Sequence, residues 1–402
     1  MIIDSVDLFY ASMPEVTLEA DGSQDALLVR VTADGHIGWG ECESSPLTSI
    51  AAFVAPRSHG VCQPVQASVI GERIDSPDDI ARMANGIRRN SMDLLQAVHM
   101  WSGIEIALWD LLGRVREEPV WRLLGYSESY PKVPYASMLM GITPQDTLDR
   151  ARTAAQSGYR AIKFGWGTYG TGSSRSDADH VAAAREGLGS DATLLIDAGQ
   201  IWVDDVKSAA ERIAALENAR VTWLEEPFLP DAFTAHADLA SRMRSVALAG
   251  GEGAHTARMA TNLIDFGRVN FIQVDTGRIG GIGPAKAVAD HAVARNVSYV
   301  NHTFTSHLAL SASLQPFAGL RDHRMCEYPV EPKQLAVDLT TSHLLPDSNG
   351  EVRAPDAPGL GISVDVGALA PYLRSVEIRI DNSPIFTSPE ADFGTAGARN
   401  VI

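Results

Sequence analysis

Seven side chains that can ionise or bind a metal recur along the middle of the chain at nearly regular spacing. Each ends, or closely follows, a short run of apolar or β-branched residues. They are Lys163, Asp197, Glu225, Glu252, Asp275, His302 and Glu327, and successive members are 34, 28, 27, 23, 27 and 25 residues apart. This spacing is close to the length of one strand plus one helix. If the strands form a parallel barrel, their carboxyl ends open on one face and the seven groups meet in one pocket.

The three carboxylates Asp197, Glu225 and Glu252 come from three successive strands. Taken singly, each could be a solvated strand-end acid or a helix cap. Together in one pocket they cannot all stay ionised without a cation. Carboxylate oxygens with room for water suit magnesium. The sequence therefore predicts a Mg²⁺ site made by these three residues.

Asp275 and His302 end the next two strands and predict a general base. A carboxylate beside a histidine fixes its tautomer and raises its basicity. His307 is a rival, but it falls in the following turn or helix start, so His302 is preferred. Lys163 could be a surface lysine, or it could neutralise a substrate carboxylate at the mouth of an acidic pocket. Glu327 could exchange a hydrogen bond with the substrate.

The elements that must position these groups form a repeating pattern after residue 130. Eight apolar or β-branched runs are predicted as strands, at residues 133–138, 161–164, 193–197, 221–224, 246–249, 269–274, 297–300 and 324–327. Amphipathic stretches at 143–157, 177–188 and 284–294 lie between them. Strands that alternate with helices indicate a parallel α/β barrel. An open doubly wound sheet is the alternative, and the strand count favours the barrel.

The regions on either side of this repeat have a different pattern. Residues 26–31 and 37–42 predict a hairpin, Ser76-Pro77-Asp78-Asp79 predicts a helix start, and 103–116 predicts a helix. We expect an N-terminal α+β domain at 1–130, the barrel at 131–328, and a C-terminal segment at 329–402 that returns to the N-terminal domain. The tail from about Asp381 is expected to be mobile.

Composition excludes several classes of function. With 33 basic and 50 acidic residues the net charge is −17, which disfavours binding to nucleic acid or anionic membranes. No apolar run approaches the 18 or so residues of a membrane span. Cys42, Cys62 and Cys326 are too few and too far apart for a disulfide scaffold. The first residues lack a basic segment followed by an apolar one, so we expect no signal peptide and a cytoplasmic location.

Several motifs in order make the chain resemble the enolase superfamily, mandelate racemase/muconate lactonizing enzyme subgroup. They are GIEIALWDLLGR from residue 103, LEEP from 224, GE at 251–252, QVD at 273–275 leading to GG at 280–281, and PGLG from 358. The resemblance covers nearly the whole length. It implies a modified (β/α) barrel under a capping domain built from the N-terminal region and a C-terminal segment. It also implies a homo-oligomer.

The same resemblance implies how the site residues act. Mg²⁺ is expected on Asp197, Glu225 and Glu252, and an Asp275–His302 pair is expected as the base. The shared reaction is removal of the proton α to a carboxylate, and a Lys or His base with Mg²⁺ is the family's known device. Lys163 and Glu327 are expected to bind the carboxylate as its charge develops.

Two departures from the family pattern point to one kind of reaction. The subgroup often carries Lys-x-Lys on the second barrel strand, but Gly165 stands at the second lysine here. With one base left, loss of a β-hydroxyl from a sugar acid is the favoured reaction. A second acid found in some dehydratases is replaced by Gly199. A sugar-lactone cycloisomerase also needs only one face, a racemase or epimerase would need an unrecognised base, and a non-catalytic binder is a remote alternative.

Substrate choice is expected to depend on two capping loops, at residues 13–24 and 43–54. The loop acids Glu15, Glu19 and Asp25 are candidates, although acids in such loops are usually only solvated. The sequence does not show which of them turns inward.

Overall fold

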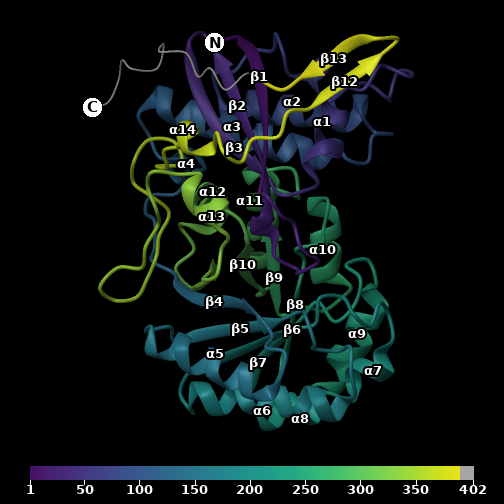
Figure 1. The fold of residues 1–402 in the computed structure, drawn as a ribbon, viewed down its shortest axis with the longest axis vertical. Coiled ribbons are helices and arrows are strands. Elements are labelled where there is room, and N and C mark those ends of the chain that lie inside the picture. The colour runs from purple at the N-terminus through teal and green to yellow at the C-terminus, as the bar shows by residue number, and fades with distance from the viewer. Residues whose placement is uncertain (390–402) are drawn as a thin grey trace.

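The central element of the molecule is a sheet of eight parallel strands, as predicted (Figure 1). The computed structural model describes residues 1–389. The strands are β4 (Val133–Leu139), β5 (Ala161–Gly165), β6 (Thr193–Asp197), β7 (Val221–Glu225), β8 (Ala247–Gly250), β9 (Phe271–Asp275), β10 (Ser298–His302) and β11 (Met325–Pro329). They pair in chain order from β4 to β10, and β11 pairs with β4.

A side chain joins the two ends of this sheet. The backbone N–H of Glu327 in β11 donates to Oδ1 of Asn301 in β10 at 2.9 Å. The amide nitrogen of Asn301 donates in turn to the Glu327 carbonyl at 3.3 Å. The sheet is therefore a nearly closed barrel, and the strand ends can converge on one pocket.

Helices connect the barrel strands and bury their apolar faces against the outside of the sheet. They are α5 (Pro144–Gln156), α6 (Ser174–Leu188), α7 (Val206–Ala210), α8 (Ile213–Asn218), α9 (Phe233–Arg242), α10 (Ala257–Asp265), α11 (Ile282–Ala294) and α12 (His307–Leu314), which runs into the short η3 (Gln315–Phe317). The Thr143 hydroxyl accepts from the Asp146 N–H, which confirms the predicted start of α5.

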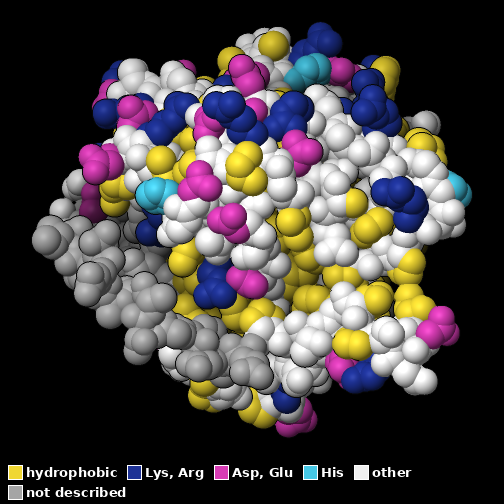
Figure 2. All heavy atoms as spheres, turned by 90° about the horizontal axis from the view of Figure 1, so that it is seen from above, with side chains coloured by type: hydrophobic (Ala, Val, Ile, Leu, Met, Phe, Trp, Pro, Cys, Tyr) yellow, Lys and Arg dark blue, Asp and Glu magenta, His cyan; other side chains and the backbone are white. Residues whose placement is uncertain are grey.

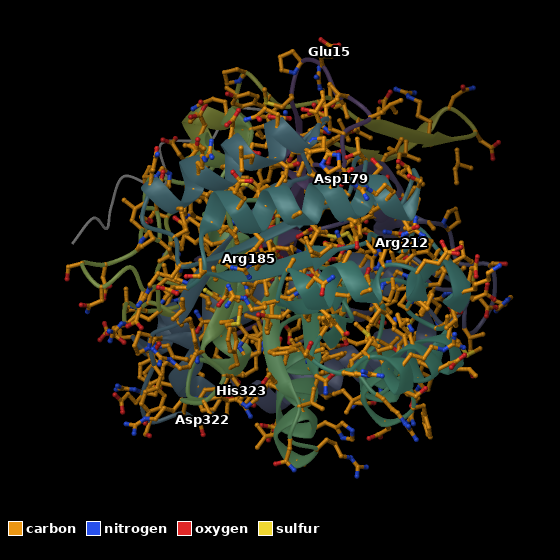
Figure 3. The ribbon with its side chains drawn as sticks, turned by 90° about the horizontal axis from the view of Figure 1, so that it is seen from below. Glu15, Asp179, Arg185, Arg212, Asp322 and His323 are labelled. Carbon is orange, nitrogen blue, oxygen red and sulfur yellow. The ribbon has the colours of Figure 1, made fainter. Side chains whose placement is uncertain are left out.

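Near the amino ends of two barrel strands, a charged side chain donates hydrogen bonds to backbone carbonyls. Figure 3, seen from below, labels Arg185 of α6 and Arg212. The Arg185 guanidinium donates to the carbonyls of Ala192 and Arg220, the residues before β6 and β7. Arg212 pairs with buried Asp177 at 2.9 Å. Arg185 therefore holds the starts of β6 and β7 together, whereas Arg212 binds the first turn of α6, which follows the carboxyl end of β5.

The N-terminal region forms a separate layer above the barrel. An antiparallel sheet of β1 (Ile3–Ser12), β2 (Asp25–Ala33) and β3 (His36–Cys42) packs on α3 (Ala97–Arg116), with α1 (Pro46–Val54), α2 (Pro77–Asn90), α4 (Val120–Leu123), η1 (Gly22–Gln24) and η2 (Val65–Ser68) around them. A Cβ at Gly38 would lie 2.1 Å from the Ala107 carbonyl oxygen, and one at Gly40 2.2 Å from that of Gly103. Glycine on β3 therefore lets α3 lie directly on the sheet.

The C-terminal segment returns to this N-terminal layer, as expected. Its elements are α13 (Gln334–Asp338), α14 (Val366–Leu369), β12 (Glu377–Ile380) and β13 (Ser383–Thr387). Leu335, Leu360 and Leu369 are buried in the same core as the three-stranded sheet. The boundaries at residues 130 and 328 stay predictions.

The tail predicted to be mobile from Asp381 begins differently. Residues 383–387 pair with β12 as a hairpin that lies beside the N-terminal layer in Figure 1. The rest of the predicted tail, 390–402, lies outside the described residues.

Seen from above, the N-terminal layer carries charged side chains of both signs and a hollow where hydrophobic side chains gather (Figure 2). Among residues 1–389, no helix has the length and apolar character that a membrane crossing needs.

Candidate active site

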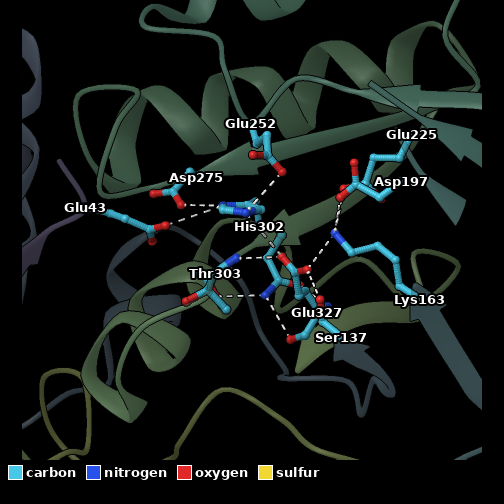
Figure 4. Close-up of polar contacts among 12 residues, drawn as sticks. Glu43, Ser137, Lys163, Asp197, Glu225, Glu252, Asp275, His302, Thr303 and Glu327 are labelled. Atoms are coloured by element: carbon cyan, nitrogen blue, oxygen red, sulfur yellow. Dashed lines mark hydrogen bonds and ion pairs between the residues drawn. The ribbon is translucent and has the colours of Figure 1, made fainter. Parts of the chain in front are cut away.

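All seven predicted side chains lie at the carboxyl end of the barrel, around one cavity (Figure 4). The last residues of β6, β7, β9 and β10 are Asp197, Glu225, Asp275 and His302. Lys163 and Glu327 lie within β5 and β11, and Glu252 follows β8 by two residues. The cavity has a volume of about 340 Å³, and Lys163, Asp197, Glu252, His302 and Glu327 line it directly. A larger cavity of about 1070 Å³ lies outside the barrel, and none of the seven lines it.

The three predicted metal ligands form a compact acidic cluster. Asp197, Glu225 and Glu252 are buried, and each offers an oxygen that lies within 4.8 Å of the others. Burial raises the pKa of Glu225 well above its usual value, and the charge of Asp197 raises it further. Burial likewise raises the pKa of Asp197. Asp197 and Glu225 are thus costly to ionise in this cluster, which a divalent cation among the three acids would relieve.

Lys163 joins this cluster to the next group of residues. Its ammonium lies 2.6 Å from Glu225, 2.8 Å from Glu327 and 3.2 Å from Asp197. Burial alone would lower the pKa of Lys163, but these carboxylates outweigh it and raise the pKa well above its usual value. The side chain is therefore a fixed positive charge at the cavity wall and a poor proton acceptor.

Glu327 is held by contacts that the sequence did not reveal. The Ser137 hydroxyl donates to its Oε1 at 2.8 Å, and the Thr303 N–H donates to its Oε2 at 2.9 Å. With Lys163 also on Oε1, the carboxylate is locked in one orientation.

Asp275 and His302 form the predicted pair. Nδ1 of His302 lies 2.6 Å from Oδ2 of Asp275, and the Gly277 N–H donates to the other carboxylate oxygen at 2.7 Å. This hydrogen bond leaves Nε2 of His302 free to face the cavity side, where it lies 3.1 Å from Glu252 and 3.8 Å from Glu327. Burial would raise the pKa of Asp275, but the hydrogen bond with His302 and the charge of Arg278 lower it overall.

The rival histidine does not reach the cavity. His307 begins α12, stacks on His343 with ring centroids 4.6 Å apart, and accepts a hydrogen bond from the Leu344 N–H. Its contacts tie the C-terminal segment to the barrel. The structure therefore brings His302 together with the other six predicted residues, and not His307.

Sequence reasoning missed two charged residues of the site, Glu43 and Arg278. Arg278 lies 2.9 Å from Glu43 and 3.4 Å from Glu252. Glu43 directly follows β3, so its carboxylate enters the site from the N-terminal layer, 4.0 Å from Nδ1 of His302. The signals available were the position of Arg278 three residues after Asp275 and the location of Glu43 at the start of an expected capping loop.

A second acid, Glu226, positions Glu252. Its Oε1 accepts from the N–H groups of Gly251 and Gly253, one on each side of Glu252. Burial raises the pKa of Glu226 to about 7, and the charge of Glu252 contributes. The second glutamate of the LEEP motif therefore acts on the loop that carries a predicted ligand.

The acids in and next to the first expected capping loop lie in different places. Glu19 and Asp21 line the cavity, and both pair with Lys333, at 3.2 and 3.4 Å. Glu15 is exposed and lies on the outside of the molecule in Figure 3. Asp25 lines a small neighbouring cavity.

Comparison with known proteins agrees with this architecture. The model of the mandelate racemase/muconate lactonizing enzyme N-terminal domain matches residues 11–125, and the enolase C-terminal domain-like model matches residues 146–368. A crystal structure of a predicted mandelate racemase from Rhodobacter sphaeroides has 62% sequence identity and a TM-score of 0.93, and the alignment covers 97% of this chain and 100% of that one.

Curated relatives are enzymes. A 3,6-anhydro-α-L-galactonate cycloisomerase from Streptomyces coelicolor is 31% identical over 66% of this chain and 69% of its own length. A D-galactarolactone cycloisomerase from Agrobacterium fabrum is 29% identical over 84% of this chain and 88% of its own. More distant relatives include sugar-acid dehydratases and an N-succinyl amino-acid racemase. With both domain models matched in order and a nearly closed barrel beneath a separate N-terminal layer, this chain belongs to the mandelate racemase/muconate lactonizing enzyme family of the enolase superfamily.

Proposed function

We propose that this protein is a Mg²⁺-dependent lyase that removes the α-proton of a sugar acid and then eliminates a β-substituent. The supporting observation is that an acidic triad and a histidine–aspartate pair meet at one cavity, where Glu252 of the triad lies 3.1 Å from Nε2 of His302. The first candidate reaction is dehydration of a sugar acid.

The residues present fit a magnesium ion. Asp197, Glu225 and Glu252 offer only carboxylate oxygens, and burial keeps the carboxylate of Glu225 costly to ionise without a cation. When bound, the ion would supply positive charge for the developing enediolate of the substrate carboxylate. Lys163 and Glu327 flank the triad, so they can hold that carboxylate by a charge and a hydrogen bond.

His302 would be the base. The hydrogen bond from its Nδ1–H to Asp275 directs Nε2 toward the substrate and stabilises the imidazolium formed when the proton is taken. A pure binding protein has no need for this pair, which argues against the non-catalytic alternative.

Two observations favour chemistry on one face of the substrate. A Cβ on Gly165 would lie 2.4 Å from the Cβ of Asp197, so no second lysine fits beside the triad. Lys163 is held protonated by three carboxylates. With a single base, elimination of a β-oxygen needs no second proton acceptor, whereas racemisation does.

A second candidate is the ring opening of a sugar lactone or anhydro sugar acid. The two curated relatives described above are cycloisomerases of such compounds. We expect such a reaction here to begin with the same proton removal. It differs only in the leaving oxygen, which belongs to a ring and not to a hydroxyl group. The predicted cytoplasmic location and homo-oligomer stay predictions.

The test is a panel of sugar acids and lactones in deuterated water with Mg²⁺, including galactarolactone, D-xylonate and L-rhamnonate. We expect at least one compound to lose its α-hydrogen and form a keto acid. Absence of both exchange and keto acid across the panel would count against the proposal, and exchange of both α-configurations would favour a racemase.

A further inference from the structure

Glu43 lies where the capping domain contacts the barrel. Its N–H donates to the Gly277 carbonyl at 3.3 Å, and a Cβ on Gly277 would lie 2.9 Å from the Cβ of Glu43. Glycine at 277 therefore lets the capping domain approach the loop that carries Asp275 and Arg278. Gly22 of the capping loop is also close, since a Cβ on it would lie 3.6 Å from Oε1 of Glu43.

The carboxyl group of Glu43 faces the substrate cavity together with His302. Both residues line this cavity (Figure 4), and Arg278 and Phe304 also line it. Lys163 and Glu327 form the wall beside Asp197 and Glu225. Glu252, the third acid of the triad, lies 3.1 Å from Nε2 of His302. A substrate carboxylate bound at the wall of Lys163 and Glu327 would direct the rest of its carbon chain toward Glu43.

The charges around the cavity favour a neutral carboxyl group at this position. Six carboxyl groups lie around the cavity, namely those of Glu43, Asp197, Glu225, Glu252, Asp275 and Glu327. The fixed cations are Lys163 and Arg278. With a divalent ion bound, the carboxylates would still exceed the positive charges by two before an anionic substrate enters. One retained proton reduces this excess.

Burial raises the pKa of Glu43 to about 8. The negative charge of Asp275 raises this pKa further, by more than the positive charge of Arg278 lowers it. Asp275, Arg278 and His302 face it from the barrel. Asp25 and Glu41 line a second cavity of about 150 Å³ that Glu43 also borders, on the capping side.

We propose that Glu43 is a second catalytic residue, the acid that protonates the leaving oxygen after His302 has removed the α-proton. This inference rests on the proposed function and supplies the separate acid that Gly199 does not provide. The smaller cavity, bordered by Asp25 and Glu41, gives Glu43 a polar path on the side away from the substrate.

In the proposed reaction His302 and Glu43 each exchange one proton with the substrate. His302 takes the proton from the α-carbon, and the electrons of that bond form the enediolate. These electrons then make the α,β double bond while the β-carbon–oxygen bond breaks and its pair stays on oxygen. The Glu43 proton joins that oxygen, which leaves as water or, in an anhydro sugar acid, becomes the hydroxyl group of the opened ring. The ring oxygen of a lactone would leave as a carboxylate and would not need this proton. His302 returns its proton to the β-carbon, and the enol proton of the product restores Glu43.

The test compares wild-type protein with Glu43→Gln, which keeps shape and polarity but has no acidic proton. D-xylonate and L-rhamnonate, which would lose a hydroxyl group, serve as probes in deuterated water with Mg²⁺. We expect keto-acid formation to fall by about 100-fold or more, the usual scale of a general acid, while α-hydrogen exchange stays within about threefold. Glu43→Asp keeps an acid at shorter reach and should recover part of the elimination. Glu15→Gln, on the exposed capping loop, is the matched control and should match wild type in both.

A readout without substrate separates this inference from the proposed function. Near neutral pH, the infrared carbonyl band of protonated carboxyl groups should lose intensity in Glu43→Gln. An unchanged band overturns the inference, as does elimination at the wild-type rate. Equal loss of exchange and elimination also overturns it, because Glu43 would then only position the substrate. If wild type neither exchanges nor eliminates any probe, the proposed function fails and the acid role fails with it, whatever the infrared band shows.

Discussion

Nε2 of His302 lies 3.1 Å from Oε2 of Glu252, so one carboxylate contacts both the predicted base and the predicted metal site. Burial alone would lower the pKa of His302, but Glu252, Glu327 and the hydrogen bond with Asp275 raise it well above its usual value. A protonated histidine cannot act as a base. Positive charge bound by Glu252 would weaken this effect, so metal binding and the neutral form of His302 are expected to favour each other.

This coupling predicts how stability depends on pH and metal. Groups with raised pKa values, such as His302 and Glu43, stabilise the folded state at low pH and lose that contribution as pH rises through the folded pKa. The pKa values of His99 and His307, lowered to about 4, change stability below 6.5, and that of Lys132, lowered to about 8, changes it above 8. Between about pH 6.5 and 8, the metal-free protein should therefore become easier to unfold.

Urea unfolding with chelator and with Mg²⁺ measures this effect. Mg²⁺ at 100 times its Kd at pH 6.5 should add about 2.7 kcal/mol to the free energy of unfolding, and the same Mg²⁺ concentration should add more at pH 8. A metal-free protein that gains stability across this range, or Mg²⁺ without effect, would contradict the coupling.

His302→Asn should abolish proton removal while leaving the metal triad in place. Loss of a general base typically costs about 10²–10⁴-fold in rate. The measurements are α-hydrogen exchange, keto-acid formation and Mg²⁺ binding by calorimetry. His307→Asn is the matched control, because its ring stacks on His343 away from the cavity. If the His302 variant keeps wild-type rates and the His307 variant loses them, the base has been misassigned.

Glu252→Gln should weaken Mg²⁺ binding and reduce turnover by about 10²–10³-fold, because charge developing on the substrate loses part of its partner. Calorimetry and turnover at several Mg²⁺ concentrations measure the two effects. Glu186→Gln, on an exposed part of α6, is the control. Full activity after exhaustive chelation would reject the metal assignment for all three acids.

A single base predicts that only one configuration at the α-carbon loses its hydrogen. Of two substrates that differ only at the α-carbon, one should exchange its α-hydrogen with solvent deuterium and the other should not, because Nε2 of His302 reaches the carbon from one side. Proton NMR of both compounds with enzyme and Mg²⁺ measures the two rates. Equal rates would refute this view and indicate a second base.

Local patterns in the sequence predicted most of the barrel and its site. Strands β4 to β11 were each found from a short apolar run, and the parallel arrangement followed from the helices between them. Because barrel strands all point the same way, position along the chain was enough to predict that Asp197 and His302 would meet. Two local details differ: α3 begins at Ala97, earlier than the predicted residue 103, and β1 was not predicted.

Contacts between the two layers were not predictable in this way. Glu43 reaches the site only because the capping domain packs on the Gly277 loop, and no local pattern records that packing. Ser137 and Thr303 are ordinary residue types whose role depends on the position of Glu327. Residues 383–387 were predicted as part of a mobile tail. They form a strand because they pair with β12, and their own sequence pattern does not show this pairing.

Gly165 gives a prediction that tests the metal site through a position that binds no metal. It is the last residue of β5 and lies beside Asp197 in the sheet register. Gly165→Ala would place a methyl group 2.4 Å from the Cβ of Asp197 and 3.0 Å from its Cγ, so the ligand must move. We expect a loss of about 1–3 kcal/mol in the free energy of unfolding, typical of overpacking, and weaker Mg²⁺ binding. Gly172→Ala is the control, because its new methyl would meet only Ser176 at 3.8 Å. Unchanged Mg²⁺ affinity in Gly165→Ala would show that Asp197 is not a ligand. Weaker affinity in Gly165→Ala but not in Gly172→Ala would support the metal site, and it would explain why this strand carries no second lysine.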